Sequence, residues 1–357
     1  MEETKYDLIV VGLGCAGLST AYYAAKKGMK VLGIEMNESE GAIGGSSTGY
    51  TRIWRTGHTS PIKDVMMEEA YELWKELERD HNEFFEEDEP VKLLYKKGAL
   101  MIGHPKHPDY PSVFSSFDKN KFIKSSEIMK RYPGLKNIPE ESNCYIIQNA
   151  GVVKSKDALT TARKLLEKKY DADLKFNTKA TDVTSNSVKI ESGEIYNATY
   201  VVVATGPYTS DGFDKSEAVA SSLETETLTF TSNEDLPPVH IELLSNGTRF
   251  YSLQDGADLT KYKIGILGPR SISSTLKHIR NRMPDKVGLL EYGSPCFFTM
   301  VEGGDFQYKT SKEGIHFVYG FSGQGFKFMP LHGKVVYHGL LKKEDQKYIP
   351  DCYRAKI

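Results

Sequence analysis

The feature that most constrains the fold is a strand–turn–helix–strand pattern near the start of the sequence. A strand is expected over residues 6–11, where Leu8, Ile9, Val10 and Val11 follow one another without polar alternation, as is typical of a parallel sheet covered on both faces. A helix rich in small residues is expected over 15–27, and a second strand over 30–34. The turn before the helix has the spacing G-x-G-x-x-G, made by Gly12, Gly14 and Gly17. This pattern predicts a βαβ unit with parallel strands.

The glycine turn is suited to binding a dinucleotide. Gly12 permits a tight turn, and Gly14 lets a pyrophosphate approach the backbone at the positive end of the helix. Glu35 directly follows the second strand, where a carboxylate can accept hydrogen bonds from a ribose hydroxyl. Glycine turns of this spacing also occur by chance, so the flanking strand and helix carry the argument. The expected cofactor is FAD or NAD.

Charge and composition exclude several classes of protein. The chain has 46 Lys and Arg against 48 Asp and Glu, a formal net charge of −2 over 357 residues, so no electrostatic argument favours nucleic acid or an acidic membrane surface. No apolar run approaches the ~20 residues of a membrane helix, and no secretory signal is recognised. We therefore expect a soluble intracellular protein of about two domains.

Cysteine and histidine spacing gives no indication of a metal site. None of the nine histidines has a neighbour pattern typical of metal ligands. The cysteines are widely spaced, with no C-x-x-C pair, and they are Cys15, Cys144, Cys296 and Cys352. Reduced thiols and no bound metal are therefore expected.

A later strand favours FAD over NAD. Residues 200–204 are apolar, end in Ala204, and are followed by Thr205 and Gly206. A hydrophobic strand ending in Ala-Thr-Gly is common in FAD-binding folds of the glutathione-reductase type. On its own this segment would be an ordinary buried strand with a turn. Paired with the first glycine turn, it favours FAD.

The remaining elements are spread along the chain. Residues 36–58 are rich in Gly, Ser and Thr and are expected to form a long loop. Further helices are expected over 61–85, 158–168 and 274–283. A last buried strand over 315–320 leads into a glycine-rich turn and another helix.

These pieces predict an α/β fold with a discontinuous, Rossmann-type FAD-binding domain. The FAD-binding domain is expected to comprise residues 1–60, 145–212 and 314–357. An inserted substrate domain with a mixed antiparallel sheet is expected to comprise residues 61–144 and 213–313.

Three further motifs join the N-terminal glycine turn in pointing to a known family. They are Thr-Arg-Ile-Trp-Arg at 51–55, Pro-Cys-Phe-Phe-Thr at 295–299, and Gly-Phe-Ser-Gly-Gln-Gly-Phe-Lys-Phe at 320–328. With them, the chain resembles the monomeric sarcosine oxidase family, which includes N-methyltryptophan oxidase and pipecolate oxidase. The segments at 151–153 and 187–191 are also similar, so the resemblance covers nearly the whole chain.

The resemblance implies roles for several side chains around the flavin. Cys296 would carry FAD through a thioether, although a lone cysteine is more often a buried structural residue. Lys263 would lie near flavin N5 and activate oxygen, although by itself it is an ordinary strand lysine. Thr51 and Arg52 would lie against the flavin.

The resemblance also implies that Arg55 and Lys327 clamp the carboxylate of the substrate. An isolated Arg or Lys is most often solvated on the surface. A surface role is a poor explanation for Lys327, which lies between Phe326 and Phe328 and follows a glycine turn. The residues expected to contact FAD are Gly12, Gly14, Cys15, Ala16, Gly17, Glu35, Met36, Ser46, Thr51, Arg52, Ala180, Ala204, Gly206, Gly323, Gln324, Gly325 and Lys327.

The chain departs from the family pattern at three positions. Leu267 stands where sarcosine oxidases carry a histidine, and Phe298 where they carry a tyrosine. Gln324 takes the place of a histidine in the glycine turn. The first two positions belong to the family's substrate pocket. The resemblance therefore implies a more apolar pocket, suited to a larger or cyclic secondary amine rather than to sarcosine.

The function that the resemblance implies is that of a monomeric FAD-dependent oxidase. It would convert a secondary amino acid, N-methylated or cyclic, and oxygen into an imine and hydrogen peroxide. One alternative is an FAD-dependent amino-acid dehydrogenase with another electron acceptor. Another is a non-catalytic dinucleotide-binding sensor, which would need neither Lys263 nor Lys327. The final tripeptide, at 355–357, resembles a peroxisomal address, so peroxisomal and cytoplasmic locations both stay open.

Overall fold

The structure of the chain is a computed structural model. In its described residues the strands form three sheets. The structure describes residues 5–41, 45–56, 58, 61–86, 90–209, 220–231, 235–266, 271–301 and 306–343.

The first sheet contains the predicted βαβ unit. Its elements are β1 (Lys5–Val11), α1 (Cys15–Lys26), β2 (Val31–Ile34), β8 (Asp173–Lys175), β9 (Ala180–Val183), β10 (Ser187–Ile190), β11 (Ile195–Val203), β17 (Gln307–Thr310) and β18 (His316–Tyr319). β1 pairs in parallel with β2 and β11, and the parallel pairing continues to β8 beyond β2 and to β18 beyond β11. The antiparallel strands β17, β10 and β9 extend this core. β1 beyond its first residues and all of β2 are buried, so both faces of this part of the sheet are covered, which accounts for their apolar sequences.

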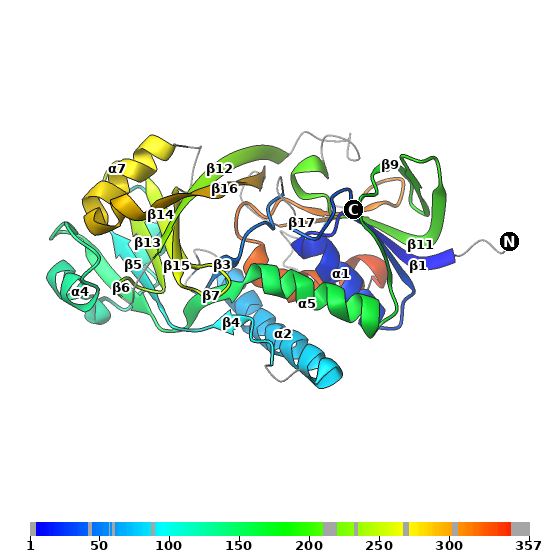
Figure 1. Ribbon diagram of the computed structural model, residues 1–357, viewed down its shortest axis with the longest axis horizontal. Coiled ribbons are helices and arrows are strands. Elements are labelled where there is room, and N and C mark those ends of the chain that lie inside the picture. Colours follow the sequence, from blue (N-terminus) through cyan, green and yellow to red (C-terminus); the bar gives the residue numbers. More distant parts are fainter. Residues whose placement is uncertain are drawn as a thin grey trace.

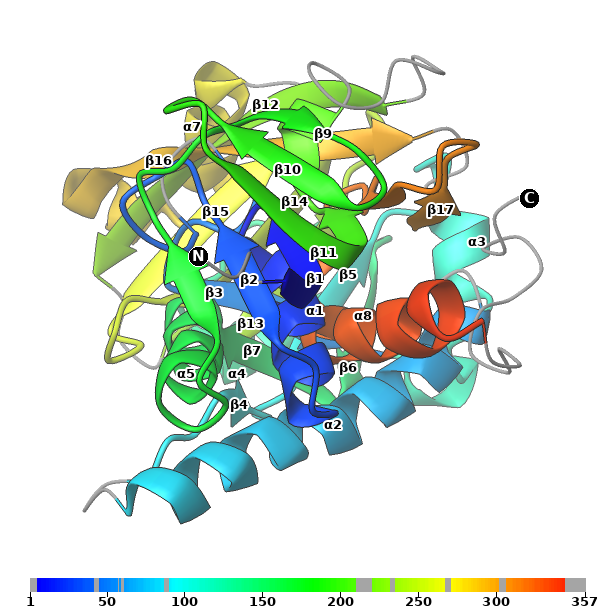
Figure 2. The same ribbon diagram turned by 90° about the vertical axis from the view of Figure 1, so that its right-hand side faces the viewer.

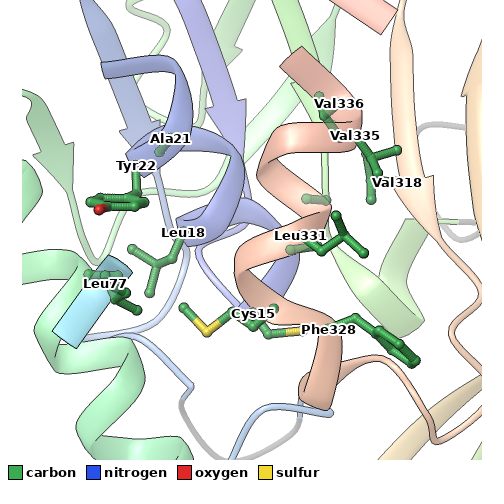
Figure 3. Packing of buried hydrophobic residues seen from close by; sticks show 14 of the residues in the cluster. Cys15, Leu18, Ala21, Tyr22, Leu77, Val318, Phe328, Leu331, Val335 and Val336 are labelled. Carbon is green, nitrogen blue, oxygen red and sulfur yellow. The ribbon is translucent and has the colours of Figure 1, made fainter. Parts of the chain in front are cut away.

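Helices pack against α1 on one side of this sheet. They are α2 (Pro61–Phe85), α5 (Ser155–Lys168) and α8 (Met329–Val335). Figure 2 shows α2 running along the outer side of the other helices, where it contacts α5 and α8. Figure 3 shows Leu18, Leu77 and Leu331 among the apolar side chains that fill the space between α1, α2 and α8. Gly333 allows α8 to approach α1, since a Cβ there would lie 2.1 Å from the carbonyl oxygen of Ser19.

The second sheet is mixed, as the sequence predicts. Its strands, in spatial order, are β16 (Leu290–Val301), β12 (Ala220–Thr231), β15 (Lys261–Ile266), β14 (Arg249–Asp255), β13 (Val239–Leu243), β5 (Ala99–Gly103) and β6 (Asn143–Ile147). β13 and β5 are parallel, and the other neighbours are antiparallel. Helices α4 (Ser125–Arg131) and α7 (Ile272–Arg282) cover one face around Phe230, Tyr262 and Ile279. Figure 1 shows this sheet at the left and the first sheet at the right.

A small third sheet joins distant segments and corrects one expectation. Its strands are β3 (Thr51–Arg55), β7 (Ala150–Lys154) and β4 (Leu94–Tyr95), and β7 pairs antiparallel with the other two. The expectation of a loop throughout 36–58 is wrong at β3, because this segment finds its pairing partner in β7, far along the chain. Gly151 permits the close crossing, since a Cβ there would lie 1.9 Å from the carbonyl oxygen of Tyr95.

The other predicted elements are confirmed, with ends that differ by a few residues. The predicted strands correspond to β1, β2, β11 and β18, and the predicted helices to α1, α2, α5 and α7. Short helices complete the described chain: α3 (Tyr110–Phe114), η1 (Lys119–Lys121), η2 (Gly206–Tyr208), η3 (Pro284–Leu289), η5 (Phe326–Phe328) and η6 (Val336–Leu341). The predicted fold class, a Rossmann-type α/β sheet with a second mixed sheet, is confirmed.

The exact domain boundaries stay a prediction. β6 belongs to the second sheet and β17 to the first, while α2 packs on α5 and α8, so these elements lie across the boundaries expected from the sequence. Within the part of the chain that the structure describes, no helix combines the length and the apolar character needed to cross a membrane. The final tripeptide lies outside the described residues, so the peroxisomal address also stays a prediction.

Candidate active site

A cavity of about 1020 Å³ lies at the carboxyl ends of the parallel strands of the first sheet and extends to the second sheet. Ligands of open α/β sheets bind at this edge. Lys263, Arg55 and every residue expected to contact FAD line the cavity, with the exception of Gly17. Gly17 is needed for packing instead, since a Cβ there would lie 1.7 Å from the carbonyl oxygen of Gly12. The fold thus brings the predicted residues together, and their individual roles stay predictions.

The nucleotide end of the cavity is built around Glu35. Its Oε2 accepts a hydrogen bond from the Leu13 N–H at 2.8 Å, and its Oε1 accepts from the Asn37 N–H at 3.0 Å and from Asn37 Nδ2 at 2.7 Å. These contacts fix the carboxylate between the glycine turn and the residues after β2. Gly12 has a φ of 90°, and a Cβ there would lie 2.8 Å from the carbonyl oxygen of Ala204. The turn therefore fits tightly against the end of β11.

The first helical residue, Cys15, is held by the loop that follows β2. Its N–H donates a hydrogen bond to Ser47 Oγ at 2.9 Å. A Cβ on Gly14 would lie 3.1 Å from the same Ser47 oxygen, so a side chain at Gly14 would crowd this wall of the cavity. Burial raises the pKa of the Cys15 thiol to about 11, although Ser47 and Arg52 lower it. The thiol is therefore protonated and is no nucleophile at neutral pH.

Arg52 ties the loop at 45–50 to the later glycine turn. Its Nη2 donates to the carbonyl oxygens of Ser46, at 2.9 Å, and of Thr48, and its Nη1 donates to the carbonyl oxygen of Thr51 at 2.9 Å. The guanidinium also lies 5.7 Å from the centroid of the Phe326 ring, in cation–π geometry. Arg52 therefore shapes the cavity wall through backbone contacts.

Lys263 projects from β15 into a buried polar cluster. Its Nζ donates to the carbonyl oxygen of Thr51 at 2.9 Å and to Asp255 Oδ1 at 3.1 Å. Asp255 also accepts a hydrogen bond from Thr51 Oγ1 at 2.6 Å. The sequence analysis did not single out Asp255. A hairpin predicted over 249–266 would have revealed it, because Asp255 pairs with Lys261 and is then a diagonal neighbour of Lys263.

Arg55 and Lys327 line one region of the cavity, where Lys327 is buried and Arg55 is partly buried. Burial lowers the pKa of the Lys327 ammonium well below its usual value, and the charges of Arg55 and Lys63 lower it further. Lys327 makes no ion pair with a carboxylate among the residues described by the structure. Burial also lowers the pKa of Arg55, whereas Asp64 raises it. An anionic group placed in this region would favour the charged forms of both side chains.

His58 is close to Arg55 and Lys327, and the sequence analysis did not predict it as a site residue. Its Nδ1 and its backbone N–H lie 2.7 and 3.1 Å from Asp64 Oδ1, while its buried Nε2 has no hydrogen-bond partner among the residues that the structure describes. Burial lowers the pKa of His58 to about 3, and the charges of Lys327 and Arg55 lower it further, although Asp64 raises it. The imidazole is therefore neutral at physiological pH.

The glycine-rich turn after β18 is fixed from the side away from the cavity. His332 is fully buried, with Nε2 donating to the carbonyl oxygen of Gly325 at 2.9 Å and Nδ1 accepting from the Tyr308 hydroxyl at 2.6 Å. Its ring stacks on Phe321 at a centroid distance of 4.1 Å. Trp74 Nε1 donates to the carbonyl oxygen of Lys327 at 2.9 Å. Local glycine signals predict the turn, but these supporting contacts come from distant segments.

The strand that contains Cys296 borders the cavity. Ser46 Oγ, on the cavity wall, donates a hydrogen bond to the carbonyl oxygen of Phe297, and Phe298 and Thr299 line the cavity. The side chain of Cys296 lies outside the described part of the structure, so the covalent link stays a prediction. Leu267 also lies outside the described residues.

Comparison with known proteins decides the family. The model of a family described as "FAD dependent oxidoreductase" matches residues 7–338. The chain belongs to this family.

This FAD-dependent oxidoreductase has curated relatives that it matches over most of its length. It is 26% identical to monomeric sarcosine oxidase of Arthrobacter sp. (strain TE1826), over 94% of this chain and 92% of that protein. It is also 26% identical to N-methyl-L-tryptophan oxidase of Salmonella arizonae, over 95% of each chain. The resemblance predicted from the sequence motifs is thus confirmed.

A solved structure supports the fold of this FAD-dependent oxidoreductase. NikD, an amino acid oxidase essential for nikkomycin biosynthesis, superposes with a TM-score of 0.81 at 20% identity, over 97% of each chain. At this identity the similarity concerns the fold.

The residues of the cavity fit FAD. The N-terminus of α1 faces the cavity at Gly14, where a missing side chain leaves room for a pyrophosphate. Glu35, anchored by Leu13 and Asn37, stands beside that position. The same cavity, of about 1020 Å³, is also lined by Lys263 and Lys327, so one space connects the nucleotide end with these residues.

Proposed function

We propose that this FAD-dependent oxidoreductase oxidises a secondary amino acid, N-methylated or cyclic, to an imine, with oxygen as the electron acceptor and hydrogen peroxide as the second product. The observation that carries the proposal is that the basic side chains of Arg55, partly buried, and Lys327, buried, lie together in the cavity that fits FAD. The names of the curated relatives, a sarcosine oxidase and an N-methyltryptophan oxidase, support a substrate of this class.

Arg55 and Lys327 would bind and orient the carboxylate of the substrate. A guanidinium presents a planar fork that matches a carboxylate, and an ammonium adds a point charge. In a site withdrawn from water, each charge-assisted hydrogen bond contributes ~1.5–3 kcal/mol. Holding the carboxylate in this way would fix the position of the adjoining C–N bond, which is the bond to be oxidised.

Bound FAD supplies the two-electron redox chemistry, and the protein supplies binding, orientation and exclusion of water. Lys263 would provide a positive charge where oxygen gains electrons, since a fixed cation stabilises developing negative charge. Cys296 would hold the cofactor covalently, and the protein would act as a monomer on a small amino acid.

The pocket favours a substrate larger than sarcosine. Phe298 presents an aromatic ring to the cavity where sarcosine oxidases carry a tyrosine, and Tyr251 and Leu253 line the second-sheet side. This wall is largely apolar, and burial of apolar substrate surface there contributes ~25 cal/mol per Å². A pipecolate-like ring or an N-methylated aromatic amino acid would use that wall, whereas sarcosine would leave it exposed.

A peroxide-coupled screen of the purified flavoprotein tests the proposal. The substrates are sarcosine, pipecolate, proline, N-methyltryptophan and fructosyl amino acids, each with and without catalase. We expect peroxide formation with a cyclic or aromatic secondary amino acid and a weaker response to sarcosine. Substrate turnover with an artificial dye but without peroxide would instead identify a dehydrogenase. No turnover with any secondary amino acid, with either acceptor, would contradict the proposed substrate class.

A further inference from the structure

The contacts of Asp255 carry an inference that goes beyond the proposed function. Asp255 Oδ1 lies 3.1 Å from Lys263 Nζ and 2.6 Å from Thr51 Oγ1. Lys263 Nζ also donates to the carbonyl oxygen of Thr51 at 2.9 Å. The three residues thus close a ring of contacts between the consecutive strands β14 and β15 and the strand β3, which lies far from them in the sequence.

All three side chains of this ring are buried. Thr51 is fully inaccessible, and Asp255 and Lys263 are 6% and 8% exposed. A buried ammonium without a counter-ion loses its proton readily, because burial disfavours the charged form. A buried carboxylate within hydrogen-bond distance has the opposite effect and favours the ammonium. Asp255 forms that ion pair with Lys263.

Other charges near Lys263 make this ion pair necessary. A Cβ built on Gly49 would lie 3.4 Å from Arg52 Nη1 and 4.0 Å from Lys263 Nζ, so the two cations flank the same glycine. The guanidinium of Arg52 therefore opposes a charge on Lys263. Two further charged residues that line the cavity, Lys261 of β15 and Glu291 of β16, pair with each other.

We propose that Asp255 is a positioning residue that keeps Lys263 protonated and directs its ammonium toward the cavity. The hydroxyl of Thr51 lies within hydrogen-bond distance of both Asp255 Oδ1 and the carbonyl oxygen of Gln254, so it fixes the end of β14 against β3. The importance of Asp255 for turnover rests on the proposed role of Lys263 toward oxygen. The effect of Asp255 on the charge of Lys263 is independent of that role.

A direct titration of Lys263 tests the proposal without reference to turnover. The protein is labelled with 13C at lysine Cε, and the Lys263 signal is assigned by its loss in Lys263→Met. In Asp255→Asn, which keeps an acceptor oxygen but no charge, the titration midpoint of Lys263 should fall by about 1–3 pH units. Thr51→Val, which removes the hydroxyl and leaves the ion pair, should leave the midpoint nearly unchanged.

A second variant controls for a local effect of the amide group that Asp255→Asn introduces. Asp255→Ser removes the charge with a smaller side chain and should shift the midpoint in the same direction. The proposal is overturned if the titration midpoint of Lys263 is unchanged in both Asp255 variants. It is also overturned if neither variant folds and neither gives a Lys263 midpoint below the wild-type value.

Oxygen kinetics of the same variants separate this proposal from the proposed function. In Asp255→Asn, reoxidation of the reduced flavoprotein by oxygen should slow at neutral pH, and its pH profile should move to lower pH with the Lys263 midpoint. Anaerobic reduction by substrate should change much less. A shifted midpoint with unaltered reoxidation would uphold the role of Asp255 and overturn the proposed role of Lys263.

Discussion

Burial, and after it the nearby guanidinium of Arg55, lowers the pKa of the Lys327 ammonium well below its usual value. Two cations held together in this way repel each other, and the repulsion is relieved when an anion lies between them. Asp64, which faces Arg55, also pairs with His58. This arrangement supports the proposal that Arg55 and Lys327 bind the carboxylate of a substrate.

Removing either cation should weaken the binding of simple carboxylates such as benzoate. Arg55→Ala or Lys327→Ala should raise the dissociation constant by about tenfold or more, since each charge-assisted hydrogen bond contributes ~1.5–3 kcal/mol. Lys334→Ala is the matched control, because Lys334 pairs with Glu69 and does not line the cavity. Quenching of flavin fluorescence on titration measures the affinities.

The double variant sharpens this test of the clamp. If both residues bind the same carboxylate, as proposed, Arg55→Ala with Lys327→Ala should lose less binding free energy than the sum of the single variants. Affinity for an amine that lacks a carboxylate should change little in any of them. Unchanged carboxylate affinity in both single variants would show that the substrate is oriented differently.

Carboxylate binding should take up a proton at Lys327. The lowered pKa of the free lysine means that it loses its proton at lower pH than an exposed lysine, and a bound carboxylate favours the charged form. Affinity should therefore fall as the pH rises through the pKa of the free Lys327. Calorimetry of benzoate binding in buffers of different ionisation enthalpy measures the proton uptake.

A lysine-to-arginine exchange provides the control for proton uptake. In Lys327→Arg the guanidinium stays charged over the whole range, so the uptake should disappear. Equal uptake in this variant and in the wild type would assign the proton to another group.

Lys263→Met should separate the two halves of the catalytic cycle. Loss of the ammonium removes the charge proposed to stabilise electron transfer to oxygen, so flavin reoxidation should slow by orders of magnitude. Anaerobic reduction by substrate should be much less affected. Stopped-flow absorbance measures both rates, and equal losses in the two would contradict a specific role toward oxygen.

Cys296 should hold the flavin covalently. After acid denaturation and electrophoresis, flavin fluorescence should stay with the wild-type polypeptide and be absent from Cys296→Ala. Cys144→Ala is the control, because Cys144 is buried in the second sheet, away from the cavity. Fluorescence that persists in Cys296→Ala would place the link at another residue.

The sequence alone predicts the parts of this site that are local in the chain. The turn at Gly12 and Gly14, the carboxylate of Glu35 and the lysine of the last glycine motif all follow from contiguous patterns, and the cavity brings them together. The glycine spacing is informative because close approach of backbone to backbone leaves no room for a side chain.

The parts that escape prediction depend on contacts between distant segments. β3 was expected to be loop because its partner, β7, lies far along the chain. Asp255 gains its importance only when β14, β15 and β3 meet. His332 is a single histidine in a helix, and nothing local indicates that it binds the carbonyl oxygen of Gly325.

Anaerobic mixing of the flavoprotein with matched pairs of amines tests the central claim most directly. Each pair differs only in the carboxylate, as in pipecolate and piperidine, proline and pyrrolidine, or N-methyltryptophan and N-methyltryptamine. We predict that at least one secondary amino acid bleaches the oxidised flavin absorbance, and that its partner does so at least about a hundredfold more slowly, since two charge-assisted contacts of ~1.5–3 kcal/mol each are lost. Bleaching at the same rate by both members of every pair, or by no secondary amino acid at all, would contradict oxidation of an amino acid held by Arg55 and Lys327.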